Sequence, residues 1–242
     1  MKPVAIVAVA TSLLVLAACD RSDPPSDRLE RAAEEVVAEV EGETLPQQAE
    51  GPYAPRDECL DQPGAAEFLS QLRSAVGSRD AEAVAALAAD DIRLDFGGGS
   101  GRELLVQRLN ADERELWAEL SEVIAMGCAS DGATLTMPWY FAQEFPGALD
   151  ASTYAVVTGE NVPLYSEAGA EREQVGSVSW DKVTYLGDDA DGIRVSWTDS
   201  ETGEQVEGYF EDASVLRSQY DYRLLASRRN NRWRITAFIA GD

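Results

Sequence analysis

Three cysteines and no histidine limit the chemistry that this 242-residue chain can perform. The missing histidine excludes the usual general base, the Ser-His-Asp arrangement and every zinc site that contains histidine. If Cys19 is modified, only Cys59 and Cys128 remain, and two thiols cannot build a cysteine-rich metal site. In an exported protein we expect these two to form a disulfide, which closes a loop of about 70 residues and contributes roughly 4 kcal/mol. A pair of free structural cysteines is the alternative.

The N-terminal end of the chain has the pattern of an export signal. Lys2 is followed by an apolar run over residues 4–16 and then by Leu16-Ala17-Ala18-Cys19. The run is shorter than the roughly 20 apolar residues of a membrane-spanning helix. The last four residues resemble the lipobox of bacterial lipoprotein signals, which implies that residues 1–18 are removed and that Cys19 is lipidated. A plain secretory signal with a chance cysteine is the alternative.

The charge balance is strongly acidic, with 44 Asp and Glu against 20 Lys and Arg and a formal net charge of −24. Such a surface repels phosphate backbones, so we expect no nucleic-acid partner. It should also avoid anionic lipid headgroups. We therefore expect contact with the lipid bilayer through the acyl chains on Cys19 rather than through a basic patch.

Two loops contain residue types that are common in ligand sites. Glycines within 97–101 precede a predicted helix, as in phosphate-binding loops, but no Lys-Ser/Thr pair follows and Arg102 occupies the third glycine position of a dinucleotide loop. Residues 188–192 read Asp-Asp-Ala-Asp-Gly, but Gly187 and Thr198 occupy the first and last ligand positions of an EF-hand. A tight turn explains the glycine loop better than a phosphate site does, and a solvated β-turn explains residues 188–192 better than a calcium site does.

Residues 19–57 predict an acidic, flexible tether. They are rich in proline and carboxylates and almost without aromatic side chains, so they cannot bury a core. Apolar residues between Leu29 and Val40 have helical spacing, and Gly42 would end this helix. The helix could contact a partner, but at under about 16 residues a fraying, solvated helix is the preferred explanation.

From residue 58 the pattern becomes helical and then mixed. We expect helices over 65–76 and 81–88, the second capped by Asp80, and a short strand over 92–96. Ser100 and Glu103 form a capping box for a helix that carries Leu105 and Leu109, and Asn110 with Glu113 is a looser cap for the next helix. That helix carries an apolar stripe over 116–124, and a strand over 134–143 that Pro138 interrupts follows it.

The helical period disappears between residues 154 and 216, where short apolar runs alternate with turn signals. This spacing predicts a small all-β barrel with strands at 154–157, 161–165, 175–178, 183–186, 193–197 and 208–210. A last hairpin, 222–229 with 232–239, turns at Asn230-Asn231, which can adopt the positive φ angles of a two-residue loop.

The helical region resembles the nuclear-transport-factor-2-like group, a cone-shaped α+β fold. The resemblance rests on Ser78-Arg79-Asp80-Ala81, on the stretch from Ile92 to Gly98 and on a final strand from Trp233 to Phe238. It implies a cavity in which a carboxylate and a tyrosine can perform acid–base work, often with a histidine. The residues that could line such a cavity are Asp95, Trp117, Trp139 and Tyr140. Without a histidine, we prefer core packing for the aromatic side chains and a strand-end hydrogen bond for Asp95.

The segment 151–217 resembles bacterial Src-homology-3-like domains. Asn161-Val162 stands at their opening Asn-Val-Arg motif, and Gly208-Tyr209-Phe210 matches a later strand. Pro163 replaces the usual arginine and Asp181 the usual glycine of the central turn, so the peptide-binding surface of the group is not assured. Five aromatic side chains would suit a groove for peptides or glycans, although filling of a small core explains several of them equally well. These five are Tyr165, Trp180, Tyr185, Trp197 and Tyr209.

Together these patterns predict an α+β fold with a small barrel inserted before the last hairpin. The expected parts are a signal (1–18), a tether (19–57), an α+β domain (58–150 plus 218–242) and the barrel (151–217). The whole chain also resembles lipoproteins of α-proteobacteria that carry a barrel of this kind near the C-terminus.

The expected function is that of a non-enzymatic lipoprotein, anchored to a cell membrane and facing the periplasm, whose barrel binds cell-wall peptide or a protein. The sequence leaves the choice between inner and outer membrane open. We expect no catalytic residue, metal or cofactor. One alternative is a ligand carrier or enzyme with a cavity near Asp95 and Tyr140. Another is a scaffold subunit of an envelope complex that acts through the helix at 29–40.

Overall fold

The computed structural model describes residues 49–111, 115–144, 153–169, 172–189, 192–200 and 202–241. The predicted signal, Cys19 and the helix at 29–40 therefore lie outside the described residues. In the ranges given, no helix is long and apolar enough to cross a membrane.

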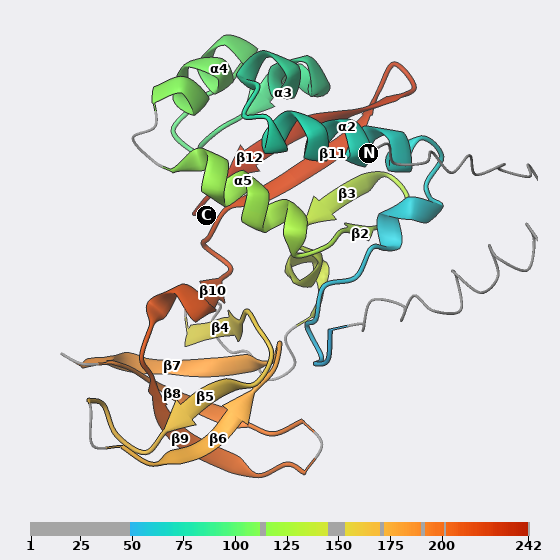
Figure 1. Ribbon diagram of the computed structural model, residues 1–242. Helices are drawn as coiled ribbons and strands as arrows, with labels where there is room; N and C mark the ends of the chain where they lie inside the picture. The colour runs from blue at the N-terminus through green and yellow to red at the C-terminus, as the bar shows by residue number, and fades with distance from the viewer. Residues whose placement is uncertain are drawn as a thin grey trace, which may run out of the picture. The chain divides into compact units, whose positions relative to one another are not determined.

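The first sheet joins residues from both ends of the described chain (Figure 1). Its five described strands have the order β1-β12-β11-β3-β2, in which β1 is parallel to β12 and all other neighbours are antiparallel. The strands are β1 (Ala88–Arg93), β2 (Ala129–Ser130), β3 (Thr134–Met137), β11 (Arg223–Arg229) and β12 (Arg232–Ile239). The predicted hairpin is confirmed, since Asn230 and Asn231 have φ angles of 51° and 61°.

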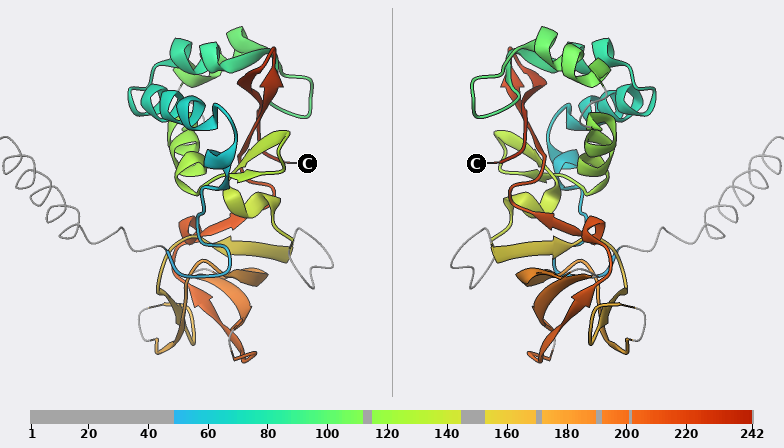
Figure 2. Two further views of the ribbon diagram at one scale, coloured as in Figure 1. Left: turned by 90° about the vertical axis from the view of Figure 1, so that its right-hand side faces the viewer. Right: turned by 90° about the vertical axis from the view of Figure 1, so that its left-hand side faces the viewer.

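Helices cover one face of this sheet, with α2 and α5 lying along it in both views (Figure 2). The helices are α2 (Ala65–Gly77), α3 (Ala81–Leu87), α4 (Arg102–Ala111) and α5 (Leu116–Ala125). The apolar stripe predicted for α2 is buried, and Asp80 caps α3 by accepting a hydrogen bond of 3.0 Å from the Ala83 N–H. Both helices therefore form for the reasons that their sequence spacing indicates.

A disulfide joins Cys59, in the short 3₁₀ helix η1 (Glu58–Asp61), to Cys128 just before β2. Both cysteines are buried in the larger core, which holds the inner faces of the four helices and of the first sheet. The predicted pairing is confirmed, and free structural cysteines are excluded.

Two predicted strands have different bounds in the structure. β1 begins at Ala88 and ends at Arg93, whereas the predicted strand covered 92–96. The predicted strand over 134–143 ends at Met137, because Pro138 has no N–H to donate to the sheet. The next residues form the 3₁₀ helix η2 (Trp139–Ala142), which buries Trp139 and Tyr140.

The second sheet comes from residues that lie between β3 and β11 in the sequence. Its seven described strands are antiparallel and have the order β10-β4-β7-β8-β9-β5-β6. They are β4 (Tyr154–Val157), β5 (Val162–Tyr165), β6 (Gln174–Val178), β7 (Lys182–Asp189), β8 (Gly192–Thr198), β9 (Gln205–Phe210) and β10 (Leu216–Ser218), preceded by the short 3₁₀ helix η4 (Ala213–Val215). A separate apolar core lies within this sheet, around Leu164, Val195 and Phe210.

The segment before η1 belongs to the packed part of the chain, although the tether was predicted to extend to residue 57. Residues 49–242 form one compact unit, in which Tyr53 and Ala54 are buried. The Tyr53 N–H donates to the Trp180 carbonyl at 2.8 Å, and its ring packs in a small cluster with Trp139 and Val156. The one aromatic side chain of the predicted tether is thus a packing residue.

Candidate functional site

The five aromatic residues proposed for a groove occupy different surroundings. Trp180 packs against the small cluster that holds Tyr53 and Trp139, outside the core of the second sheet. Trp197 packs against that core, and Tyr185 is exposed and bonded to the Asp188 carboxylate, which raises the pKa of Tyr185. The structure brings only Tyr165 and Tyr209 together as directly paired neighbours.

Tyr165 and Tyr209 lie opposite each other on β5 and β9, and Arg194 on β8 is the next residue in the same cross-strand row. We call these three residues the tyrosine row. Their sequence neighbours Leu164, Gly208 and Phe210 are buried, so the row faces away from the core. Both tyrosine rings are half-buried, and Arg194 is exposed.

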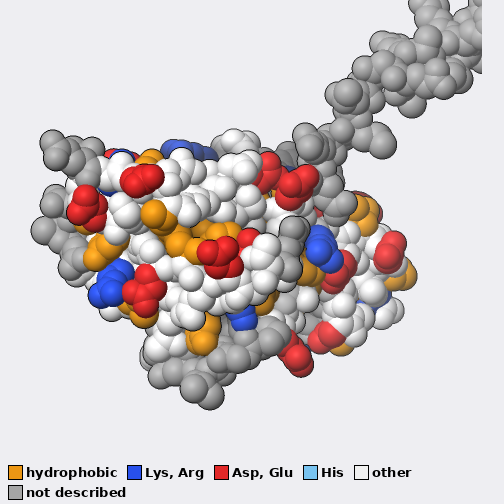
Figure 3. Space-filling view, turned by 90° about the horizontal axis from the view of Figure 1, so that it is seen from below, with side chains coloured by type: hydrophobic (Ala, Val, Ile, Leu, Met, Phe, Trp, Pro, Cys, Tyr) orange, Lys and Arg blue, Asp and Glu red, His pale blue; other side chains and the backbone are white. Residues whose placement is uncertain are grey.

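Two ion pairs flank the tyrosine row. The Arg172 guanidinium lies over the Tyr165 ring at 4.0 Å and bonds to Glu211 at 2.7 Å, and this carboxylate raises the pKa of Arg172. Arg194 pairs with Glu207 at 2.8 Å. Glu207, Tyr209 and Glu211 alternate along the outward side of the chain, so carboxylates lie on both sides of Tyr209. Seen from below, this end of the molecule has hydrophobic side chains between separate acidic and basic groups (Figure 3).

This arrangement can bind a ligand by stacking and by charge. Tyrosine rings offer apolar faces and hydroxyl groups, and the guanidinium and carboxylate groups beside them can bond to a ligand of mixed charge. The exposed Arg194–Glu207 pair contributes little to stability, about 0–1 kcal/mol. Its position beside the rings therefore suits recognition better than support of the fold.

Asp181 explains why Trp197 is not part of this surface. Its carboxylate accepts a hydrogen bond of 3.0 Å from the Trp197 indole N–H, and Asp181 is buried. Burial raises the pKa of Asp181, while the bonds from Trp197 and from the Lys182 N–H oppose this shift. Asp181, which stands where the resemblance led us to expect a glycine, therefore holds the Trp197 side chain in place.

The four residues proposed for a cavity are not gathered around one space. Trp117 packs in the larger core, while Trp139 and Tyr140 pack in the small cluster that also holds Tyr53. Burial raises the pKa of Tyr140. Trp139 is buried with its indole N–H unpaired among the described residues, and the Arg56 guanidinium lies 4.7 Å from the centre of its ring.

Asp95 is engaged in the glycine turn that follows β1. It accepts a hydrogen bond from Arg108 and one of 2.7 Å from the Gly99 N–H, and these bonds lower its pKa. The Leu94 N–H donates to the Gly99 carbonyl at 2.8 Å, and Gly98 and Gly101 have positive φ angles. This geometry is that of a tight turn with a bonded carboxylate, which was the preferred explanation of both sequence features.

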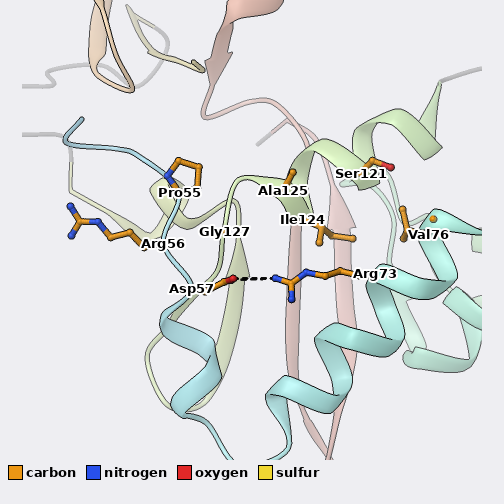
Figure 4. A pocket seen from close by; sticks show the side chains of 10 residues that line it. Pro55, Arg56, Asp57, Arg73, Val76, Ser121, Ile124, Ala125 and Gly127 are labelled. Atoms are coloured by element: carbon orange, nitrogen blue, oxygen red, sulfur yellow. Dashed lines mark hydrogen bonds and ion pairs between the residues drawn. The ribbon is translucent and has the colours of Figure 1, made fainter. Parts of the chain in front are cut away.

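A separate hollow of about 390 Å³ lies between the segment before η1 and the C-terminal ends of α2 and α5 (Figure 4). Val76, Ile124 and Ala125 supply apolar surface, and Arg73 bonds to Asp57 at 3.2 Å across one side. In the same view the Arg56 side chain points away from that pair. Sequence reasoning missed this hollow because its walls come from three separated segments, one of them assigned to the tether.

The described residues contain no group of three or more Cys, Asp or Glu side chains placed to hold a metal ion.

Comparisons with known proteins give fold likenesses at low identity. No protein-family model and no curated protein sequence matches the chain. It is similar to a protein of unknown function with a cystatin-like fold from Nostoc punctiforme, at 11% identity over 76% of this chain and 92% of that one, with a TM-score of 0.28. It is also similar to a nuclear-transport-factor-2-like protein with a cystatin-like fold from Novosphingobium aromaticivorans, at 12% identity over 90% and 88% of the two chains, with a TM-score of 0.26.

A de novo designed protein with a curved β-sheet is a third similar structure, at 10% identity over 74% of this chain and 99% of that one, with a TM-score of 0.28. In this chain, the strand order of the first sheet and the positions of its helices form an α+β arrangement.

Proposed function

We propose that this chain is a non-enzymatic lipoprotein of the bacterial cell envelope that binds peptides through the tyrosine row. In this proposal the second sheet is a Src-homology-3-like barrel inserted into a nuclear-transport-factor-2-like domain. Acyl chains on Cys19 hold the protein to a membrane on its periplasmic side. The observation that supports the peptide site most directly is the pairing of Tyr165 with Tyr209 between the Arg172–Glu211 and Arg194–Glu207 ion pairs.

The position of the two tyrosines supports recognition over packing. The second sheet has its own apolar core, and Tyr165 and Tyr209 face away from it. Paired aromatic rings on an outward face are a common platform for extended peptides. The two flanking ion pairs supply both charge signs, which favours a peptide that carries both carboxylates and amines, such as the peptides of the cell wall.

The anchor part of the proposal rests on the sequence. The stretch Leu16-Ala17-Ala18-Cys19 supports lipidation, and the Cys59–Cys128 disulfide suits an oxidising compartment such as the periplasm. Replacement of Cys19 by Ala should release the protein from membranes in a fractionation experiment. Continued membrane association of this variant would contradict the anchor.

Co-sedimentation with purified cell-wall sacculi tests the peptide site. The chain from Asp20 onward should sediment with sacculi, and the double variant Tyr165→Ala/Tyr209→Ala should lose about tenfold in affinity, as is typical of central aromatic contacts. Tyr185→Ala is the matched control, because Tyr185 is an exposed tyrosine of the same sheet outside the row. Equal binding by the double variant with an unchanged melting temperature would overturn the proposal.

The two alternative functions have less structural support. A cavity enzyme would need Asp95 and Tyr140 at one site, but Asp95 is bonded within its turn and Tyr140 is buried in the small cluster. The scaffold function would depend on the helix at 29–40, which lies outside the described residues.

A further inference from the structure

Four arginines surround a hollow beside the turn between β11 and β12. This turn lies at the upper right of Figure 1. The hollow measures about 620 Å³, and Asp90, Asp91, Ala89 and Asn230 complete its lining. We call it the arginine hollow, and its arginines are Arg102, Arg229, Arg232 and Arg234.

Three of these arginines lie on one face of the hairpin. Arg229 and Arg232 are directly opposite each other on the two strands, and Arg234 follows two residues later on β12. Trp233 between them is buried, so Arg232 and Arg234 point to the other, outward side. Like charges placed directly opposite each other destabilise a hairpin, so folding alone does not explain this pair.

Backbone carbonyls position two of the guanidinium groups. Arg102 donates to the Ala88 carbonyl through Nε at 2.9 Å and Nη2 at 2.6 Å, and its Nη1 pairs with Asp90 at 2.9 Å. Arg234 donates through Nη1 to the Ala86 carbonyl at 2.5 Å. The Arg232 guanidinium, by contrast, makes no hydrogen bond or ion pair to any residue in the described ranges, although the Arg232 backbone pairs with Arg229 in the hairpin. The hollow thus combines two fixed guanidinium groups with one that keeps its donors available.

The local charge is opposite to that of the whole chain. Four guanidinium groups against the carboxylates of Asp90 and Asp91 leave a formal charge of +2, in a protein with a net charge of −24. The Asp90 side chain is 90% exposed, so its pair with Arg102 is weakly held. The total charge predicted a surface that avoids anions, but the formal charge at this hollow is positive.

We propose that the arginine hollow binds a phosphate-bearing group. Guanidinium groups bond to phosphate oxygens through two parallel N–H donors, and several of them around one hollow can satisfy more than one phosphate oxygen at a time. The phosphate can belong to the headgroup of an anionic lipid or to a soluble phosphate compound. This site lies on the first sheet, so it does not depend on the peptide site proposed for the second.

Two probes separate these sources. Inorganic pyrophosphate is titrated into the chain from Asp20 onward by calorimetry, and flotation measures binding to vesicles of phosphatidylcholine with and without phosphatidylglycerol. The test variant is Arg229→Gln/Arg232→Gln, which keeps polar side chains that can donate hydrogen bonds and removes the opposed charges. Arg93→Gln is the control, because Arg93 is an exposed arginine of β1 outside the hollow.

We expect the double variant to lose at least about tenfold in affinity, the control to bind normally, and binding to weaken as salt is raised. Binding of pyrophosphate supports a soluble ligand, and binding only to phosphatidylglycerol vesicles supports a lipid headgroup. The proposal is overturned if neither probe binds. It is also overturned if the double variant, with an unchanged melting temperature, binds as well as the unmodified chain.

Discussion

The tyrosine row and the arginine hollow use arginine in opposite ways. At the row, Arg172 and Arg194 each have a carboxylate partner, so the surface around the tyrosines is close to neutral. At the hollow, Arg229 and Arg232 face each other. Paired charges around aromatic rings suit a ligand of mixed charge, whereas opposed positive charges suit an anion. One acidic chain can therefore have two surfaces with different binding preferences.

The disulfide gives the largest expected effect and tests whether the two surfaces depend on different parts of the fold. Replacement of Cys59 and Cys128 by Ala should lower the free energy of unfolding by about 4 kcal/mol, because the unfolded chain loses a long closed loop. Urea unfolding with and without reductant measures this loss. A change below about 1 kcal/mol would contradict the account of the disulfide as a major support of the first sheet.

Arg217 should give the next largest effect, because it joins β10 of the second sheet to α5. It is buried and donates to Glu119 at 2.9 Å and also to Glu122. Arg217→Ala should cost about 2 kcal/mol in urea unfolding, since charge-assisted bonds are lost and carboxylates are left without their partner. In the same measurement Arg194→Ala, which removes an exposed pair, should cost no more than about 1 kcal/mol. If the two variants lost the same free energy of unfolding, Arg217 would support the fold no more than Arg194 does, which would contradict this account.

Asp181 should produce a smaller, pH-dependent effect in the second sheet. Its pKa is raised by burial, so its contribution to stability is fully present below the ordinary aspartate value and is lost as the pH rises through the folded-state value. Asp181→Asn keeps an acceptor for the Trp197 N–H and removes this titration. The stability of the variant relative to the unmodified chain should therefore increase with pH above about 4 in melting experiments. A difference that does not vary with pH would contradict the burial argument.

The opposed arginines should give the smallest change in stability. Arg229→Gln/Arg232→Gln should leave the free energy of unfolding unchanged or raise it by up to about 1 kcal/mol, because a repulsive cross-strand pair is removed. Thermal unfolding at low salt measures this difference. A clear loss of stability would mean that these arginines support the hairpin, which would weaken the contrast with the tyrosine row.

The sequence predicted local features well where neighbouring residues decide them. Asp80 at the start of α3, the Asn230-Asn231 turn and the apolar stripe of α2 each depend on residues a few positions apart. The disulfide was also predictable, because the export pattern left only two cysteines to pair.

Features that depend on distant residues were not predictable in this way. The row of Arg194, Tyr209 and Tyr165 requires the order β8-β9-β5, in which β5 pairs with a strand far along the chain. The arginine hollow requires β1 beside β12, and the total charge of −24 concealed it. A net charge is a sum over the whole chain, so it gives no information about where residues of the opposite charge cluster on the surface.

Trp139 and Tyr140 show the same limit within a single segment. They were part of the strand predicted over 134–143 with an interruption at Pro138, but the strand ends before Pro138 and the two rings pack with Tyr53 from the segment assigned to the tether. No local pattern could indicate that partner, because it lies more than 80 residues away in the sequence.

Amide NMR titration of the chain from Asp20 onward tests the two-surface account most directly. A cell-wall peptide should shift the amide signals around Tyr165 and Tyr209, and pyrophosphate should shift those around Arg229 to Arg234, with each set unaffected by the other probe. Shifts of one common set by both probes, or no shifts at either surface, would contradict the account.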